Sequence, residues 1–148
     1  DDFFRSLNNS RKSRAGKVFE LVIEKLFRYL QFPVETQKKI NNQKIDFIFP
    51  SLEHYNNNPL ETILFSAKRT YKERWKQVIP EKNNLRFFLA TIDTKISKNQ
   101  LVEIEKAGIY VVNTKKNKDS VAHYKSSGNV ISFEHFINFH LDHQMCQW

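Results

Sequence analysis

The chain has 148 residues, 40% of them hydrophobic, which suffices for one packed core but not for two. Its 24 Lys and Arg outnumber its 16 Asp and Glu and give a formal net charge of +8, which suits a polyanionic partner such as nucleic acid. One cysteine excludes an internal disulfide, and no apolar run reaches the roughly 18 residues of a membrane span. We therefore expect one cytoplasmic domain over residues 1–148 with no membrane partner.

The first third of the chain predicts a helix followed by two strands. Apolar residues recur at helical spacing from about residue 15 to residue 30, so one stripe of this helix should face the core. The runs VETQKKI (34–40) and KIDFIFP (44–50) flank a polar turn and predict two short strands. The Asn-rich stretch over residues 51–61 predicts a loop.

Strands and helices then alternate. TILFSAK (62–68) predicts a strand, and Thr70 with Glu73 forms the capping box of a following helix. RFFLATID (86–93) and IYVVN (109–113) predict two more strands around a second helix. This β-α-β-α-β order implies parallel strands with right-handed crossovers.

The second of these helices and the end of the chain carry their own signals. Ser97 caps the second helix and Gly108 ends it. A loop of mixed charge over residues 114–129 then leads to a closing helix from about Ser132 to Gln144. The apolar residues of this closing helix recur at helical spacing, so it should bury one stripe.

Asp46 and Lys68 form the first candidate site. Strand alternation predicts that Ile45, Phe47 and Phe49 share one face, so Asp46 lies on the other face with Ile48. An acid on one strand and a lysine on the next are typical of metal-dependent phosphodiesterases, in which carboxylates hold Mg²⁺ near the scissile phosphate. A strand-start Asp that forms a turn and a solvated strand-end Lys explain the same pattern without catalysis.

A second acid is needed because one carboxylate holds Mg²⁺ weakly. The usual pattern has that acid two residues before the lysine, where this chain has Ser66. Glu81, about three turns along the following helix, and Glu20, on the first helix, are the candidates to supply it.

The strings SRAGKVFELVIEKL, KIDFIFPSLEHY and SAKRTYKERWKQVIPE resemble the catalytic C-terminal domain of EcoRII-type restriction endonucleases. The resemblance runs over roughly residues 11–113 and implies the PD-(D/E)xK restriction-endonuclease-like α/β fold, a central mixed β-sheet flanked by helices. It further implies a homodimer that cuts double-stranded DNA with Mg²⁺ at a CC/GG-containing site, with CCWGG as the expected form, and leaves 5′-phosphate ends.

The resemblance also assigns roles to residues. Asp46 matches the family's strand aspartate, Lys68 its catalytic lysine and Glu81 the acid displaced onto the helix, so that Asp46 and Glu81 hold the metal. Glu20 matches the glutamate of the first helix, and Tyr55 matches a tyrosine near the active centre. The recognition triplet Lys72-Glu73-Arg74 matches the motif that reads adjacent C:G pairs.

The recognition triplet also fits that role by its chemistry. Lys and Arg donate to guanine O6 and N7 in the major groove, and Glu accepts from cytosine N4. The same triplet in a first helical turn is also typical of a solvated, charge-complementary surface.

The chain departs from the family at two positions. Ile45 stands where the family's Pro-Asp doublet has Pro, and Pro80 directly precedes Glu81, where it kinks or ends the helix. If Glu81 does not reach the metal, the chain is a DNA-binding module without catalysis. The other alternative is a repair or junction nuclease of the same fold. No stretch corresponds to the effector domain of the EcoRII type.

Two further clusters, one of basic residues and one of histidines, each have a functional and a purely structural explanation. Arg11, Lys12 and Arg14 belong to a basic N-terminal arm over residues 1–14, which either grips DNA phosphates or is simply solvated. Two interpretations fit the histidines near the C-terminus, a zinc site or a plain amphipathic helix. We favour the amphipathic helix. These histidines are His135, His140 and His143.

Overall fold

The computed structural model describes residues 12–71 and 86–148, with side chains from residue 16 onward. Its described strands form one six-stranded mixed sheet in the order β1-β2-β3-β4-β5-β6. They are β1 (Glu35–Ile40), β2 (Gln43–Phe49), β3 (Ile63–Ala67), β4 (Arg86–Ala90), β5 (Ile109–Asn113) and β6 (Val130–Ser132). Strands β1 to β3 pair antiparallel, and β3 to β6 pair parallel. The predicted mixed sheet and the parallel order of β3, β4 and β5 are confirmed.

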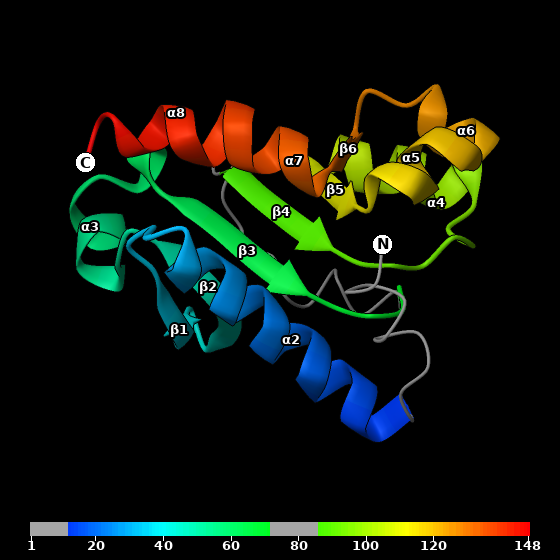
Figure 1. Cartoon of the computed structure of the whole chain (residues 1–148). Helices are drawn as coiled ribbons and strands as arrows, with labels where there is room; N and C mark the ends of the chain where they lie inside the picture. The colour runs from blue at the N-terminus through cyan, green and yellow to red at the C-terminus, as the bar shows by residue number, and fades with distance from the viewer. Residues whose placement is uncertain (1–11, 72–85) are drawn as a thin grey trace.

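Helices cover the sheet (Figure 1). They are α2 (Lys12–Tyr29), α3 (Leu52–Asn57), the 3₁₀ turn η1 (Pro59–Glu61), α4 (Lys98–Lys106), α5 (Lys115–Ser120) and α6 (Ala122–Lys125). A continuous C-terminal helical segment follows as α7 (Phe133–His135), η3 (Phe136–Leu141) and α8 (Asp142–Met145), with π-helical winding in η3. Within the described ranges, no helix combines the length and the apolar character that crossing a membrane requires.

The β1–β2 hairpin positions the first candidate strand. Its two-residue turn is Asn41-Asn42, and both residues have positive φ, 51° and 64°. This is the geometry of a type I′ turn, whose twist matches that of paired strands, and Asn tolerates it better than most residues with a Cβ. The turn therefore fixes the register in which β2 runs back along β1.

Each face of the sheet has its own core. The phenylalanine core, on the α2 face, joins α2 and the C-terminal helical segment to the sheet through edge-to-face ring contacts such as Phe27–Phe49, with centroids 4.9 Å apart. The opposite core lies under α4 and α6 and includes Leu101, Ile104 and Tyr124. Because the sheet is buried on both faces, β3 consists entirely of buried residues.

Two predicted loops contain helices. Residues 51–61 form α3 and η1, and residues 114–129 contain α5 and α6. Side-chain caps explain both starts, because Ser51 Oγ accepts from the His54 amide and Thr114 Oγ1 accepts from the Asn117 amide. Such short helices bury too few residues to produce an apolar period.

The predicted helix ends are otherwise close to the observed ones. Helix α2 begins at Lys12, so the last residues of the predicted N-terminal arm are helical. Ser97 and Gln100 form a capping box at α4, and Gly108 follows this helix with φ 78°, in the region that favours glycine. The strand β6 just before the closing helix was not predicted. The helix predicted from Thr70 lies largely outside the described residues.

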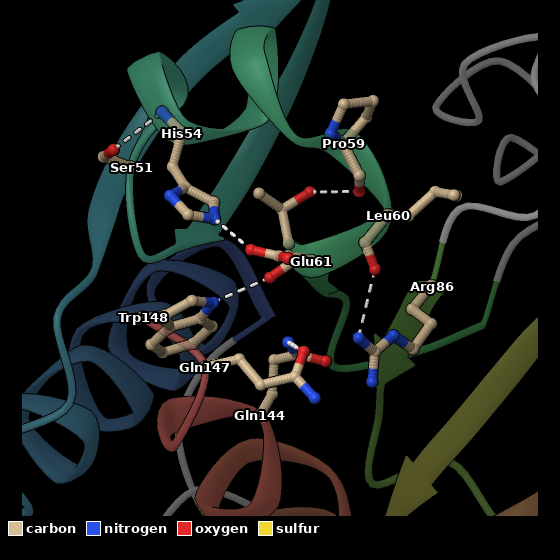
Figure 2. Close-up of polar contacts among 10 residues, drawn as sticks. Ser51, His54, Pro59, Leu60, Glu61, Arg86, Gln144, Gln147 and Trp148 are labelled. Carbon is tan, nitrogen blue, oxygen red and sulfur yellow. Dashed lines mark hydrogen bonds and ion pairs between the residues drawn. The ribbon is translucent and has the colours of Figure 1, made fainter.

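The C-terminus is fastened beside the start of β3 (Figure 2). Trp148 Nε1 donates to the Glu61 carbonyl oxygen over 2.7 Å, and the Glu61 carboxylate lies 3.3 Å from His54 Nε2. From β4, Arg86 Nη2 donates to the Leu60 carbonyl oxygen over 3.2 Å. The segment that enters β3 is thus held by groups from α3, from β4 and from the end of the chain.

Candidate functional site

Asp46 is a buried carboxylate within the sheet. It lies in β2 with 3% of its surface exposed, and its Oδ2 accepts a hydrogen bond of 2.9 Å from the Ala67 amide of β3. The pairs Phe47↔Phe65 and Ile48↔Leu64 set the antiparallel register, which continued by one residue puts Asp46 opposite Ser66. The expected meeting of Asp46 with the end of the next strand is therefore observed.

The predicted alternation of β2 is wrong at Ile45. Ile45 packs in the opposite core with Ile48, whereas Phe47 and Phe49 pack in the phenylalanine core. The interruption coincides with Gln37 of β1, which the hairpin register puts opposite Asp46 and whose φ is 58°. This local distortion accompanies the turn of the Asp46 carboxylate toward the Ala67 amide.

Lys68 follows β3 directly and is exposed. Its amide continues the parallel ladder by donating to the Ala90 carbonyl oxygen over 2.8 Å. Ser66, two residues earlier, is 1% exposed, and its Oγ has no hydrogen-bond partner within residues 12–71 and 86–148. Buried hydroxyls are usually paired in folded proteins, so this oxygen is a candidate for a further ligand beside Asp46.

Glu20 of α2 joins the same cluster. Its pKa is raised above the ordinary value, first because burial disfavours the carboxylate and next because the Asp46 carboxylate is close. Lys44, Lys68 and Lys17 counter this by lowering the Glu20 pKa. The structure thus brings Glu20, Asp46 and Lys68 together in one charged cluster, the acid–lysine site.

Lys44 belongs to the acid–lysine site but was not singled out in the sequence. It lies in β2, two residues before Asp46, and is exposed. Because the alternation of β2 is interrupted at Ile45, regular spacing from Asp46 could not have predicted the position of Lys44. Its positive charge adds to that of Lys68 on the side of the site where an anion would approach.

Tyr55 packs against the opposite core. It is in α3, half-buried against the opposite core, and burial raises its pKa. Glu20 is on α2, which packs on the other face of the sheet. The described contacts therefore place Tyr55 with the opposite core, and its assigned role near the active centre stays a prediction.

Several predicted site residues lie outside the described part of the chain. These are Arg11, Lys72, Glu73, Arg74 and Glu81. Lys12 and Arg14 are described only as backbone positions in the first turn of α2. Their assigned roles stay predictions.

The C-terminal histidines pack along the helical segment. Burial, helped by the nearby positive charges of His135 and Arg86, lowers the pKa of His140, whose ring contacts Phe88 with centroids 5.0 Å apart. Within residues 12–71 and 86–148, no three His, Cys, Asp or Glu side chains gather as a metal site. The buried stripe of this segment matches the amphipathic helix that the sequence favoured; it comprises Phe133, Phe136 and Leu141, with Ile137 partly buried.

The acid–lysine site suits a hard cation and an anionic substrate. Two carboxylates that repel each other are both stabilised by a divalent cation with oxygen ligands. The bond to Ala67 engages only Oδ2 of Asp46, and the unpaired Ser66 hydroxyl is a further buried oxygen beside it. The three lysines around the acids attract phosphate. The two acids among the described residues are too few to hold such a cation, and Glu81 is the remaining candidate for a further ligand.

Comparisons with known proteins agree with this chemistry. The family model described as EcoRII C terminal matches residues 1–137. The type II restriction enzyme SsoII of Shigella sonnei is 34% identical over an alignment that covers 92% of this chain and 48% of that enzyme. The type II restriction enzyme EcoRII of Escherichia coli is 34% identical over 72% of this chain and 28% of its own length.

A solved structure shares the fold over nearly the whole chain. Metal-depleted Ecl18kI in complex with uncleaved DNA superposes with a TM-score of 0.81 at 32% identity, over 99% of this chain and 51% of that one. The chain therefore spans about half the length of SsoII and Ecl18kI, and less than a third of EcoRII.

Proposed function

This chain belongs to the EcoRII C-terminal family, and we propose that it is the catalytic part of a type II restriction endonuclease that hydrolyses phosphodiesters in double-stranded DNA. One observation of the structure carries the proposal: Glu20, Asp46 and Lys68 meet at the end of β3, on three different elements. The identity to SsoII and EcoRII, both type II restriction enzymes, supports it.

Asp46 and Glu81 would hold Mg²⁺, with Glu20 as a further acid nearby. A bound Mg²⁺ would supply a nucleophilic water at neutral pH and counter-charge for the attacked phosphate. Burial of Asp46 and its bond to the Ala67 amide fix its carboxylate, so this ligand needs no rearrangement before binding. The unpaired hydroxyl of Ser66 stands where the usual pattern has its second acid.

Lys68 would act on the phosphate directly. Its ammonium, exposed at the end of β3, would stabilise the charge that develops on the phosphate oxygens and orient the attacking water. Lys44 would add a second positive charge to the same approach. In-line attack at phosphorus would leave 5′-phosphate and 3′-hydroxyl ends.

The recognition triplet would select the DNA site. Lys72 and Arg74 would donate to guanines and Glu73 would accept from a cytosine, so the target contains CC and GG steps, with CCWGG as the proposed form. The triplet begins four residues after Lys68 in the sequence. So short a separation would tie the position of the cut to the recognised bases.

The proposed active form is a homodimer. A near-palindromic duplex site has two equivalent strands to cut and two equivalent half-sites to recognise. Two copies of the chain related by a two-fold axis would satisfy both demands. Static light scattering on the purified protein, with and without a CCWGG duplex, tests this point by mass.

The first experiment is incubation of the purified protein with Mg²⁺ and plasmid DNA of known sequence. We expect discrete fragments whose ends map to CC/GG sites, and we expect Asp46→Ala and Lys68→Ala to abolish them. Lys106→Ala is the matched control, because it removes the same positive charge from an exposed position on α4. It should cut like the wild type.

Two outcomes would contradict the proposal. Intact plasmid with a gel shift of CC/GG duplexes would mean that the chain binds without cutting. Fragments whose ends map to no common sequence, or to branched structures only, would indicate a nuclease of the same fold with another task.

A further inference from the structure

The connection that follows β3 is fastened to the chain that follows β4. The Lys68 amide donates to the Ala90 carbonyl oxygen over 2.8 Å. One residue on, the Arg69 carbonyl oxygen accepts from Thr91 Oγ1 over 2.9 Å and from the Ile92 amide over 3.3 Å. Because Thr91 is fully buried, its hydroxyl exchanges no hydrogen bond with solvent and its bond to Arg69 is protected.

Asp93 extends this fastening to the end of the connection. Its Oδ2 accepts from the Tyr71 amide over 2.9 Å, and its Oδ1 accepts from the Lys95 amide over 2.8 Å. Bonds from amides to a carboxylate are stronger than neutral ones. Each oxygen of the Asp93 carboxylate therefore already has a main-chain donor.

Asp93 is itself held by hydrogen bonds from the sheet and from α6. Its carbonyl oxygen accepts from Tyr124 Oη over 2.8 Å and from Asn113 Nδ2 over 2.9 Å, and both donors are fully buried. Its amide donates to Thr91 Oγ1 over 3.1 Å. Burial raises the pKa of Tyr124 to about 12, so this hydroxyl remains a donor at every pH at which the protein works.

A continuous chain of hydrogen bonds thus runs from the buried sheet to Tyr71. Tyr71 directly precedes Lys72, the first residue of the recognition triplet, and Lys68 lies three residues before Tyr71. The same few residues after β4 consequently fix the main chain on both sides of this short stretch.

We propose that Asp93, supported by Thr91, is a positioning residue that holds the main chain at Tyr71, directly before the predicted recognition triplet, in a fixed place relative to Lys68. The proposal rests on the proposed function, since it assigns Asp93 a task in sequence-specific cleavage. Asp93 touches neither DNA nor metal in this scheme. It acts through the Tyr71 amide.

The substitution Asp93→Asn tests the proposal sharply. Asn keeps the shape of the side chain but has one acceptor oxygen for two amide donors, so its NH₂ group must face either Tyr71 or Lys95. We expect kcat on a CCWGG duplex to fall about 10- to 100-fold, because small displacements of aligned groups cost that much. The ratio of the cleavage rates on CCWGG and on a duplex with one outer C:G pair replaced should fall at least about tenfold.

Two matched pairs of variants separate positioning from stability. Asp119→Asn removes the same charge from an exposed carboxylate that pairs with Lys115, and it should leave both kcat and the ratio unchanged. Thr91→Val removes the hydroxyl without changing the size of the side chain and should lower the ratio, whereas Thr91→Ser keeps the hydroxyl and should restore most of it.

The measurements are single-turnover cleavage and thermal unfolding of the same preparations. A lower unfolding temperature with an unchanged cleavage ratio at 20 °C in Asp93→Asn and Thr91→Val would overturn the inference, since Asp93 would then only stabilise the fold. A wild type that cuts no duplex would instead overturn the proposed function. The wild-type control on plasmid DNA distinguishes the two failures.

Discussion

The two ends of β3 differ in how their buried polar groups are hydrogen-bonded. At the start, Thr62 is 1% exposed and its Oγ1 donates to the Pro59 carbonyl oxygen over 2.7 Å, while Glu61 is engaged by Trp148 and His54. At the other end Ser66, equally buried, has a hydroxyl that no described residue pairs. Figure 2 shows the contacts that Pro59, Leu60 and Glu61 make at the first end.

The charges differ in the same way. The Glu61 carboxylate lies 3.3 Å from a histidine nitrogen, whereas the pKa of Glu20 is raised first by burial and next by the Asp46 carboxylate. Buried polar groups are usually paired in a folded protein, and exceptions concentrate where function requires them. The groups at the start of β3 thus pair with one another, whereas its other end brings together two acids and a buried hydroxyl that no described residue pairs.

Asp46→Asn should produce the largest change at the functional end. We expect cleavage to fall about 10²- to 10³-fold, the effect of removing one stabilising group from an active site. Asn Oδ1 still accepts from the Ala67 amide, so the free energy of unfolding should change by less than about 1 kcal/mol. Single-turnover cleavage and urea unfolding measure the two quantities. A variant that cuts normally would remove Asp46 from the site.

Trp148→Phe, beside the start of β3, should lower the stability of the fold but leave cleavage unchanged. The variant keeps a ring against the phenylalanine core but loses the donor to the Glu61 carbonyl oxygen. We expect the free energy of unfolding to fall by about 1 kcal/mol, the typical value of one hydrogen bond, with an unchanged cleavage rate. Urea unfolding and cleavage at 20 °C test both parts. A slowed cleavage would mean that the two ends are coupled.

The smallest expected effect concerns Glu20 and pH. Its pKa in the folded protein is raised above its ordinary 4.5, so the folded state favours the protonated form. Stability from this group is fully present below pH 4.5 and is lost as the pH rises through the raised pKa. Without metal, Glu20→Gln should therefore be more stable than the wild type at pH 7.5, and the difference should close toward pH 4.5.

Urea unfolding in EDTA at the two pH values measures this difference. Glu24→Gln is the matched control, since it removes the same charge from α2 at a carboxylate paired with Arg28 at 2.9 Å. It should not share the pH dependence. A difference that widens as the pH falls would contradict the raised pKa of Glu20, which burial causes first and the Asp46 carboxylate next.

The sequence predicted the elements whose signals are long or local. Helix α2 has an apolar period over several turns, and α4 has Ser97 at its start and Gly108 after its end. The meeting of Asp46 with the end of β3 followed from strand neighbours and alternation. The resemblance added the family, which the comparison over residues 1–137 confirms.

The features that were missed depend on tertiary contacts. Ile45 packs in the opposite core at the point where β1 is distorted at Gln37, a residue whose positive φ no sequence pattern predicts. The closeness of Glu20 to Asp46 depends on how α2 packs against the phenylalanine core. No sequence pattern indicates the contacts of Asp93, because its partners are main-chain groups.

That reliance on main-chain groups has an evolutionary consequence. Asp93 and Thr91 hold the Tyr71 amide and the Arg69 carbonyl oxygen, which every residue except proline provides at position 71 and every residue provides at position 69. The hydrogen bonds thus place no demand on the side chains of this stretch. A lineage can therefore exchange a side chain in this stretch and still inherit these hydrogen bonds, within the limits set by the packing of Tyr71 against the opposite core.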